Sequence, residues 1–562
     1  MAEVNTLACI ESNSYSVLNS YAKNEVRVQR RMIGQFSRRQ FLNAVGKAGG
    51  SAAVYQSALA LGLISNTQAT RAALKPVTGS RKKVIILGAG LAGLTSAYEL
   101  ERAGYECTIL EASHRIGGRN LTIRGGDTVD ELGYPQKCNF DNDKDLYFNA
   151  GPSRIPIHHH HLMHYLRTFQ VPLEVFTNNN RNAWVHDTNA FGGKRMRIKQ
   201  YAADARGFMA ELSSKSLNRK DFDKKFTDDD FERFQAFLKS YGDLNENALY
   251  KGSSRAGYQS GGMISPAIKK TPADFREILK SSFWDYNMHW AQSEDQSAPM
   301  LTATGGMDAI VNGFVDNLKS KVLLNAQVQN VQLHEHSVSV AYRHKGKLEQ
   351  ISGDYCFNSI PKHIMSGIEN NFPHDYQTAL SSIPRGLLFK MGIQMNERFW
   401  EKEDIYGGFS WTNQDIEQLW YPPHGTFGKK GIMIVYMFSE EATYRFGLLN
   451  PKQRIEKALR EAEAIHPDIR KYVDSAVSVP WHRMNHIMGC TAAWTPELRD
   501  RWFARLQEPV GRHYLIGDQI SYHPGWQEGA FGSAHFALSH LNARQHKEID
   551  DKPSGIAQER GV

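Results

Sequence analysis

The chain of 562 residues is predicted to be an α/β protein built on a parallel sheet. Three observations near residue 80 predict this class. Residues 82–87 form a short, β-branched apolar run, which is typical of a strand buried on both faces. A glycine-rich turn and a helical pattern over 94–103 follow, and a second apolar run covers 105–110. Because a strand, a helix and a strand in this order form a parallel unit, we expect a parallel sheet here.

The turn at 88–93 reads Gly-Ala-Gly-Leu-Ala-Gly. Gly88 allows a tight turn, Gly90 lets a pyrophosphate approach the backbone, and Gly93 lets the helix pack closely on the strand. The helix amino terminus then directs free N–H groups at the phosphates. Glu111, 23 positions after Gly88, can bind ribose hydroxyls and would repel a 2′-phosphate. The pattern predicts a Rossmann-like dinucleotide site that disfavours NADP.

The next segment, 111–119, favours FAD over NAD. It reads Glu-Ala-Ser-His-Arg-Ile-Gly-Gly-Arg, and its glycine pair allows the chain to run close to a cofactor. Arg119 can neutralise a phosphate. A nicotinamide dehydrogenase has no obvious use for this extension, whereas it resembles the E-x-x-x-R-x-G-G-R segment of flavin amine oxidases.

Five later blocks, in the family's order, make the chain similar to a bacterial L-amino acid oxidase of the flavin amine oxidase superfamily over about 81–545. These blocks lie at 148–156, 305–314, 324–331, 389–400 and 517–530. The resemblance implies an FAD-dependent enzyme that converts L-amino acids and O2 to 2-oxo acids, ammonia and hydrogen peroxide. It also implies a Rossmann-like (GR2-type) FAD domain, an interleaved α+β substrate-binding domain and a helical insert.

The order of the blocks predicts discontinuous domains. We expect the FAD domain at 81–140, 290–385 and 480–545, and the substrate-binding domain at 141–194 and 386–479. The charge-rich, amphipathic stretch 195–289 predicts the helical subdomain. The polar residues 546–562 predict a tail.

The substrate's α-carboxylate needs a fixed cation, and Arg154 is the candidate because a guanidinium holds a carboxylate bidentately. The resemblance gives Tyr421 a second contact with this carboxylate, and it places Gly525 and Trp526 beside the substrate and the flavin. Lys390 lies in an apolar, strand-like run. The resemblance implies that Lys390 holds a water near the flavin and assists the reaction with O2.

The remaining expected FAD contacts are backbone or side-chain contacts from the same blocks. They are Gly88, Gly90, Leu91, Ala92, Gly93, Glu111, Ala112, Gly118, Arg119, Ser153, Arg154, Val328, Gly517, Asp518, Trp526, Gln527 and Ala530.

Two departures from related families leave questions open. Residues 187–288 contain no histidine, so either a base from elsewhere serves or the substrate amine binds deprotonated. Cys490 lies where monoamine oxidases link their flavin, but the tyrosine that follows there is Thr491 here. We expect noncovalent FAD, with a thioether at Cys490 as the alternative.

The run His158–His161 suggests a metal site. We expect a helix to begin at His158, and consecutive histidines on a helix point in different directions. The prediction is therefore no metal.

The amino-terminal segment 1–80 predicts an export signal and linker. Arg38 and Arg39 precede Phe41-Leu42 and an Ala/Gly-rich stretch, which resembles a twin-arginine signal. This segment carries nine basic and three acidic residues, hence six of the eight net positive charges. Most of the net positive charge therefore belongs to this amino-terminal segment. We expect a periplasmic or secreted protein that uses the twin-arginine machinery.

Other classes of protein also need to be considered as functions for this chain. Two enzyme classes share these motifs and remain alternatives: an amino acid 2-monooxygenase, and a polyamine or monoamine oxidase. No aromatic-interleaved basic stretch supports nucleic-acid binding. No apolar run of about 18 residues predicts membrane insertion. The sequence leaves the oligomeric state open, a homodimer included.

Overall fold

A computed structural model describes residues 71–550, without 73, 78–80, 221–224 and 298. The predicted export signal around Arg38 and Arg39 lies outside the described residues. The segment predicted as a tail lies outside them beyond Asp550; within it, the last helix, α16 (Gln527–Asp550), continues to Asp550.

The predicted α/β class is confirmed by a five-stranded sheet in which all neighbouring strands are parallel. The strands come from distant parts of the chain, in the order β14 (Lys321–Leu323), β2 (Glu106–Leu110), β1 (Lys83–Leu87), β18 (Tyr355–Asn358) and β27 (His513–Leu515). After its first residue β1 is wholly buried, as its β-branched sequence requires.

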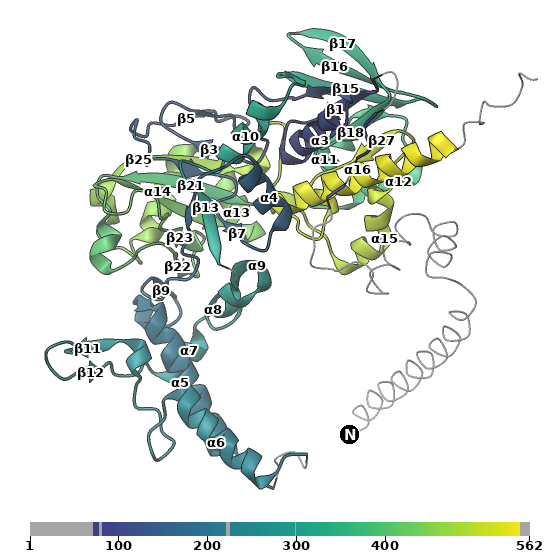
Figure 1. Ribbon diagram of the computed structural model, residues 1–562. Helices are drawn as coiled ribbons and strands as arrows, with labels where there is room; N and C mark the ends of the chain where they lie inside the picture. The colour runs from purple at the N-terminus through teal and green to yellow at the C-terminus, as the bar shows by residue number, and fades with distance from the viewer. Residues whose placement is uncertain (1–70, 73, 78–80, 221–224, 298, 551–562) are drawn as a thin grey trace, which may run out of the picture. The chain divides into compact units, whose positions relative to one another are not determined.

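Helices and a second sheet cover the two faces of this parallel sheet. On one face α3 (Leu91–Arg102) packs against α10 (Ala309–Asn317) and α16, and Figure 1 shows α16 beside α3. Another cluster of buried hydrophobic residues lies on the opposite face of the parallel sheet. Its elements are β15 (Ala326–Leu333), β16 (Val338–His344), β17 (Lys347–Gly353), β19 (Glu369–Asn370), α11 (Lys362–Met365), α12 (His374–Ser382) and α15 (Pro496–Gln507).

A seven-stranded, mostly antiparallel sheet forms the second core. Its order is β10 (Met196–Arg197), β9 (Trp184–His186), β22 (Phe409–Thr412), β23 (Gln418–Trp420), β24 (Gly431–Met437), β21 (Phe389–Met395) and β25 (Val473–Pro480). Two helices, α13 (Glu440–Leu448) and α14 (Pro451–Ala462), pack on this sheet. Every residue of β21 is buried, so Lys390 lies inside the protein.

Further small sheets of two or three strands complete the fold. They are β7 (Ile155–Pro156), β13 (Met300–Ala303) and β8 (Leu173–Val175); β3 (Thr122–Ile123) with β6 (Phe148–Asn149); β4 (Thr128–Val129) with β5 (Gln136–Lys137); and β20 (Arg385–Gly386) with β26 (Thr491–Ala492). The helix α4 (His160–Thr168) follows β7.

The charge-rich insert is mainly helical and also contains a hairpin. Its helices are α5 (Ile198–Ser216), α6 (Asp228–Gly242), α7 (Phe275–Lys280) and α8 (Tyr286–His289), and its hairpin pairs β11 (Tyr258–Ser260) with β12 (Ile268–Lys269). The short helix α9 (Glu294–Ser297) follows the predicted end at 289, and we refer to residues 195–297 together as the insert. Among the described residues, no helix has the length and apolar character needed to span a membrane.

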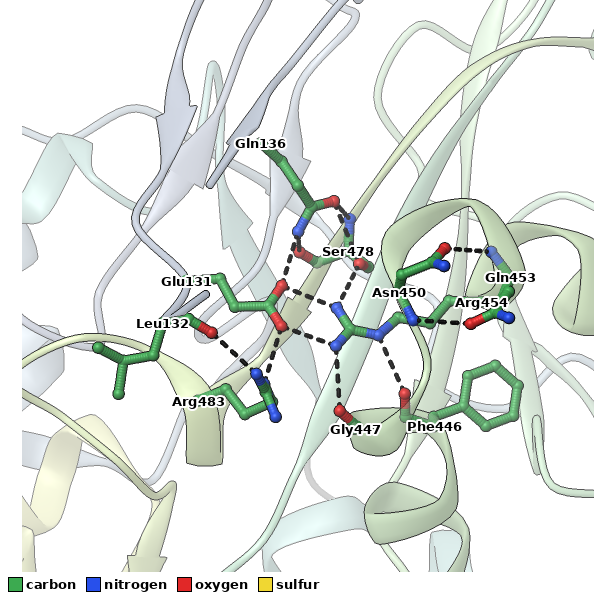
Figure 2. A network of polar contacts seen from close by, with 10 residues as sticks. All are labelled: Glu131, Leu132, Gln136, Phe446, Gly447, Asn450, Gln453, Arg454, Ser478 and Arg483. Carbon is green, nitrogen blue, oxygen red and sulfur yellow. Dashed lines mark hydrogen bonds and ion pairs between the residues drawn. The ribbon is translucent and has the colours of Figure 1, made fainter. Parts of the chain in front are cut away.

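A buried ion pair joins segments 323 positions apart (Figure 2). Both side chains, Glu131 after β4 and Arg454 in α14, are fully buried, and two hydrogen bonds of 2.7 Å connect them. The other N–H groups of Arg454 donate to the carbonyls of Phe446 and Gly447 and to the hydroxyl of Ser478. All five N–H donors therefore have acceptors, which a buried guanidinium requires.

Replacing Arg454 with alanine should leave the buried Glu131 carboxylate with only Arg483 and Gln136 as side-chain partners. We expect the free energy of unfolding to fall by about 3 kcal/mol, the lower end of the cost of breaking a buried pair, measured by urea denaturation. The matched control is Arg470→Ala, because Arg470 is exposed and its ion pairs with Glu456 and Glu463 lie at the surface. That change should cost less than about 1 kcal/mol. Equal costs for the two variants would contradict the role of the buried pair.

Candidate functional site

One cavity of about 550 Å³ is lined by segments of both cores. Most of the predicted site residues lie on its wall. They are Gly88, Gly90, Leu91, Ala92, Glu111, Ala112, Gly118, Arg119, Ser153, Arg154, Val328, Lys390, Gly517, Asp518, Gly525, Trp526, Gln527 and Ala530. Gly93 and Tyr421 are not on the wall. The fold thus brings together residues that are more than 400 positions apart in the sequence.

The glycine turn after β1 forms one end of the cavity. Gly88 has φ +94°, a conformation that favours glycine. A Cβ at Gly93 would lie 2.0 Å from the Gly88 carbonyl oxygen, so Gly93 allows close packing and does not face the cavity. A Cβ at Gly90 would meet no atom within 4 Å, so the space at the amino terminus of α3 is open. This arrangement fits a phosphate group.

Glu111 is held beside the same turn. Its carboxylate accepts hydrogen bonds from the backbone N–H groups of Ala89 (2.7 Å) and Ser113 (2.9 Å). The carboxylate is therefore oriented on the cavity wall, where it can accept further hydrogen bonds from ribose hydroxyls.

The structure gives Arg119 a carboxylate partner, although the sequence suggested a phosphate. Its guanidinium forms an ion pair with Asp518 and also donates to the carbonyl of Cys490. The Asp518 carboxylate in turn accepts from the N–H of Gly525 at 2.7 Å. Arg119 thus fixes the carboxy-terminal block of the cavity wall.

Arg154 is an ion-pairing group that the described residues leave without a partner. Its side chain is buried, and its Nε and Nη1 atoms have no hydrogen-bond partner within the described part of the chain. Burial lowers the pKa of Arg154 to about 10, so the guanidinium remains charged at neutral pH. A buried cation that lines a cavity and lacks hydrogen-bond partners in the described part of the chain is suited to bind an anion.

Aromatic rings surround this guanidinium. Its central carbon lies 4.9 Å from the ring centres of Trp290 and Trp420, 5.6 Å from that of Trp526 and 5.8 Å from that of Phe409. These rings stabilise the charge without using its hydrogen-bond donors. The cage was missed from the sequence, because its members come from four separate segments.

Lys390 lies near Arg154 and is also buried. Its Nζ atom donates to the carbonyls of Asn149 (3.3 Å) and Gly151 (2.6 Å) and to the hydroxyl of Ser153 (2.9 Å). Burial, and then repulsion from Arg154, lowers the pKa of Lys390 to about 7. The side chain can therefore gain or release a proton near neutral pH.

Tyr421 does not face the cavity, contrary to the role suggested for it. Its hydroxyl bonds to Ser410 (2.6 Å) and His466 (2.8 Å) in the core. The preceding residue, Trp420, lies on the cavity wall, and successive residues of an extended chain point to opposite sides. Tyr436 of the neighbouring strand β24 also lies on the wall, and its ring centre is 5.4 Å from the Lys390 Nζ.

Cys490 lines the cavity as a thiol. Burial raises its pKa to about 11, so it is not activated as a nucleophile.

The expectation that His158 begins a helix is wrong. The helix α4 begins at His160, and both His158 and His159 precede it. The Nε2 atoms of both side chains reach one oxygen of Asp295, each at 3.0 Å. Consecutive histidines on a helix would point in different directions, but His158 and His159 precede the helix. The helix argument therefore does not exclude a shared ligand for these two side chains.

A comparison with known protein families matches residues 91–537 to the family described as flavin containing amine oxidoreductase. Among curated proteins, the chain is 26% identical over 488 residues to an L-amino-acid oxidase of Pseudechis australis, covering 84% of this chain and 88% of that protein. It is also 26% identical over 505 residues to an L-amino-acid oxidase of Crotalus adamanteus, covering 85% and 89% of the two chains.

Solved structures show a similar fold. A putrescine oxidase bound to putrescine superposes with a TM-score of 0.55 at 17% identity, covering 83% of this chain and 99% of that one. The cyclohexylamine oxidase of Brevibacterium oxydans gives a TM-score of 0.55 at 15% identity, covering 83% and 100% of the two chains.

Gly90→Ala should fold normally and bind its dinucleotide poorly. The new methyl group meets no protein atom, but it occupies the open space where a pyrophosphate would approach. We expect the purified variant to lose most of its bound cofactor, measured by absorbance after gel filtration, while its circular dichroism spectrum is unchanged.

The control is Gly367→Ala, an exposed position outside the cavity where the added Cβ would have only the Ile364 carbonyl oxygen nearby, at 3.6 Å. This variant should keep its cofactor. Full cofactor content in Gly90→Ala would show that the phosphates lie elsewhere.

Proposed function

The chain belongs to the flavin-containing amine oxidoreductases, and from this premise we propose that it is an L-amino acid oxidase that uses FAD. It would convert an L-amino acid, water and O2 to a 2-oxo acid, ammonia and hydrogen peroxide. The observation that carries the proposal is the buried guanidinium of Arg154, a cavity-lining side chain whose Nε and Nη1 atoms have no hydrogen-bond partner among the described residues.

Arg154 selects the class of substrate in this proposal. An α-amino acid presents a carboxylate, which can accept two hydrogen bonds from a guanidinium. A simple amine has no such group, and its ammonium would place a second positive charge beside a buried cation. We therefore favour amino acids over amines, and L-amino-acid oxidases are also the curated relatives.

The phenol of Tyr436 is our candidate for a second contact with the carboxylate. It lies on the cavity wall next to Lys390 and within electrostatic range of Arg154. We assign it this role in place of Tyr421, whose hydroxyl is occupied in the core.

The residues around the glycine turn fit FAD. Gly90 leaves open space for the pyrophosphate, and Glu111 is positioned for the ribose. When bound, FAD supplies the ring that accepts a hydride from the substrate. We propose noncovalent binding, because the thiol of Cys490 is held in its protonated form.

Trp526 and Trp420 form aromatic walls beside Arg154 in this proposal. They exclude water from the carboxylate site, which strengthens the ion pair with the substrate. Lys390 would supply a positive charge and a proton during the reduction of O2, which takes up two electrons and two protons to form hydrogen peroxide.

We also propose that the chain reaches the periplasm or the exterior through the bacterial twin-arginine pathway. The support is the pair Arg38–Arg39, which is followed by Phe41-Leu42 and an Ala/Gly-rich stretch. This pathway exports folded proteins, which suits an enzyme that binds FAD before export.

Arg154→Met should lower kcat/KM for L-amino acids by about 10³-fold, because two charge-assisted hydrogen bonds to the carboxylate are lost. The measurement is peroxide production across the L-amino acids, with FAD content determined by absorbance. Each preferred amino acid is compared with the amine that lacks its carboxylate, and the variant should no longer discriminate between them. Undiminished discrimination would refute Arg154 as the anchor.

Two matched variants extend this test. Tyr436→Phe should raise KM, whereas Tyr421→Phe should not, because only Tyr436 lies on the cavity wall. Analysis of the same reactions for CO2 and amide separates an oxidase from an amino acid 2-monooxygenase.

Lys390→Met should slow the reaction of the reduced enzyme with O2 by about 10²-fold. Because the pKa of Lys390 is about 7, the ammonium form predominates below pH 7 and is lost above it. We therefore expect this step to slow as the pH rises through 7 in the native enzyme and to be independent of pH in the variant. Stopped-flow absorbance after mixing with O2 measures both rates, and an unaltered pH profile in Lys390→Met would contradict the assignment.

A further inference from the structure

Four side chains of metal-binding type meet beside the cavity. His158 and His159 precede α4, Asp295 lies in α9 of the insert, and His523 precedes α16. The Nε2 atoms of His158 and His159 both lie 3.0 Å from the Asp295 Oδ1, and the His523 Nδ1 lies 3.7 Å from the Asp295 Oδ2. Two other segments of the chain thus converge on the Asp295 carboxylate.

The spacing of these atoms suits a small transition-metal cation. The ligand atoms of His158, His159 and Asp295 all lie within 4.8 Å of one another. With metal–ligand bonds of about 2.0 to 2.1 Å, the ligand atoms of a tetrahedral zinc site lie about 3.3 Å apart. The 3.0 Å separations of the His158 and His159 Nε2 atoms from the Asp295 Oδ1 lie close to that value. The His523 Nδ1 lies 3.7 Å from the other carboxylate oxygen, and this half-exposed ring must turn toward the other three ligands to complete the site.

The charge of the cluster also suits a cation. Asp295 contributes a carboxylate, which can balance part of the charge of a divalent ion, and the imidazoles can supply the remaining ligands.

We propose that His158, His159, Asp295 and His523 form a binding site for one divalent transition-metal ion of the Zn²⁺ type. Three imidazole nitrogens and one carboxylate oxygen make a tetrahedral donor set that zinc accepts. Calcium and magnesium prefer several oxygen ligands and should bind poorly here.

The ion would connect the helical insert to the wall of the cavity. Asp295 is followed by Gln296, and His523 by Pro524; both of these following residues line the cavity. The His159 ring also packs edge-on against Trp526, with ring centres 5.1 Å apart. A bound ion would therefore clamp α9 of the insert to the segment that carries Trp526.

The test uses tag-free holoenzyme that has been treated with a chelator and dialysed against graded Zn²⁺, with zinc measured by mass spectrometry. We expect one zinc per chain, and a raised temperature of unfolding when zinc is bound. Asp295→Asn and His159→Ala should each lower the affinity for zinc by more than about 100-fold. Each change removes a side chain that binds the metal directly, and not one that only contacts a ligand. Excess Ca²⁺ should not displace the zinc.

The matched control is His160→Ala. His160 belongs to the same histidine run, but it is exposed and begins α4. This variant should bind zinc as the native chain does. Circular dichroism verifies that each variant is folded, and His523→Ala, which changes a more exposed ligand, provides a variant with less risk of misfolding.

Three results would overturn the proposal: substoichiometric zinc in the native chain, equal binding by His160→Ala and the three ligand variants, or displacement of zinc by Ca²⁺. None of these measurements depends on turnover, so the metal site and the proposed oxidase activity can fail separately.

Discussion

The buried ion pair between Glu131 and Arg454 is the interaction on which the attachment of the segment after β4 to α14 and the seven-stranded sheet depends. Neither group contacts solvent, so removal of either leaves the other buried with fewer partners. Arg483 also binds Glu131, and the chain that follows it supplies Met484, Asn485, His486, Ile487 and Cys490 to the cavity wall. The buried charges therefore contact the segment that forms this part of the wall.

Two buried arginines in this fold show how a structural cation differs from a binding cation. Arg454 has acceptors for all five N–H groups, and these come from the protein itself. Arg154 is almost as deeply buried, but aromatic faces surround it and leave donors free. Rings reduce the cost of burying the charge without satisfying its hydrogen bonds. The Nε and Nη1 atoms of Arg154, which lack hydrogen-bond partners among the described residues, mark the place where we propose that an anionic ligand binds.

The parts of the site that could be predicted from the sequence are those with local spacing. Gly88, Gly90 and Glu111 could be assigned because a strand, a turn and a helix of known length fix their relation. Trp420 was missed in favour of Tyr421 because an error of one residue along an extended chain reverses the face. The partner of Arg119 and the convergence on Asp295 depend on contacts between distant segments, which no local pattern encodes. The aromatic cage of Arg154 was missed for the same reason.

The parallel sheet is completed late in synthesis, because its central strand β1 ends at Leu87 and its edge strand β27 begins only at His513. At about 5 to 20 residues per second, a ribosome takes roughly 20 to 90 s to cover that distance. During this interval the face of α3 that α16 later covers has no native partner. Folding of this sheet therefore depends on the pairing of strands that are far apart in the sequence, and such pairings form slowly. The glycine turn after β1 therefore emerges long before the sheet that it extends is complete.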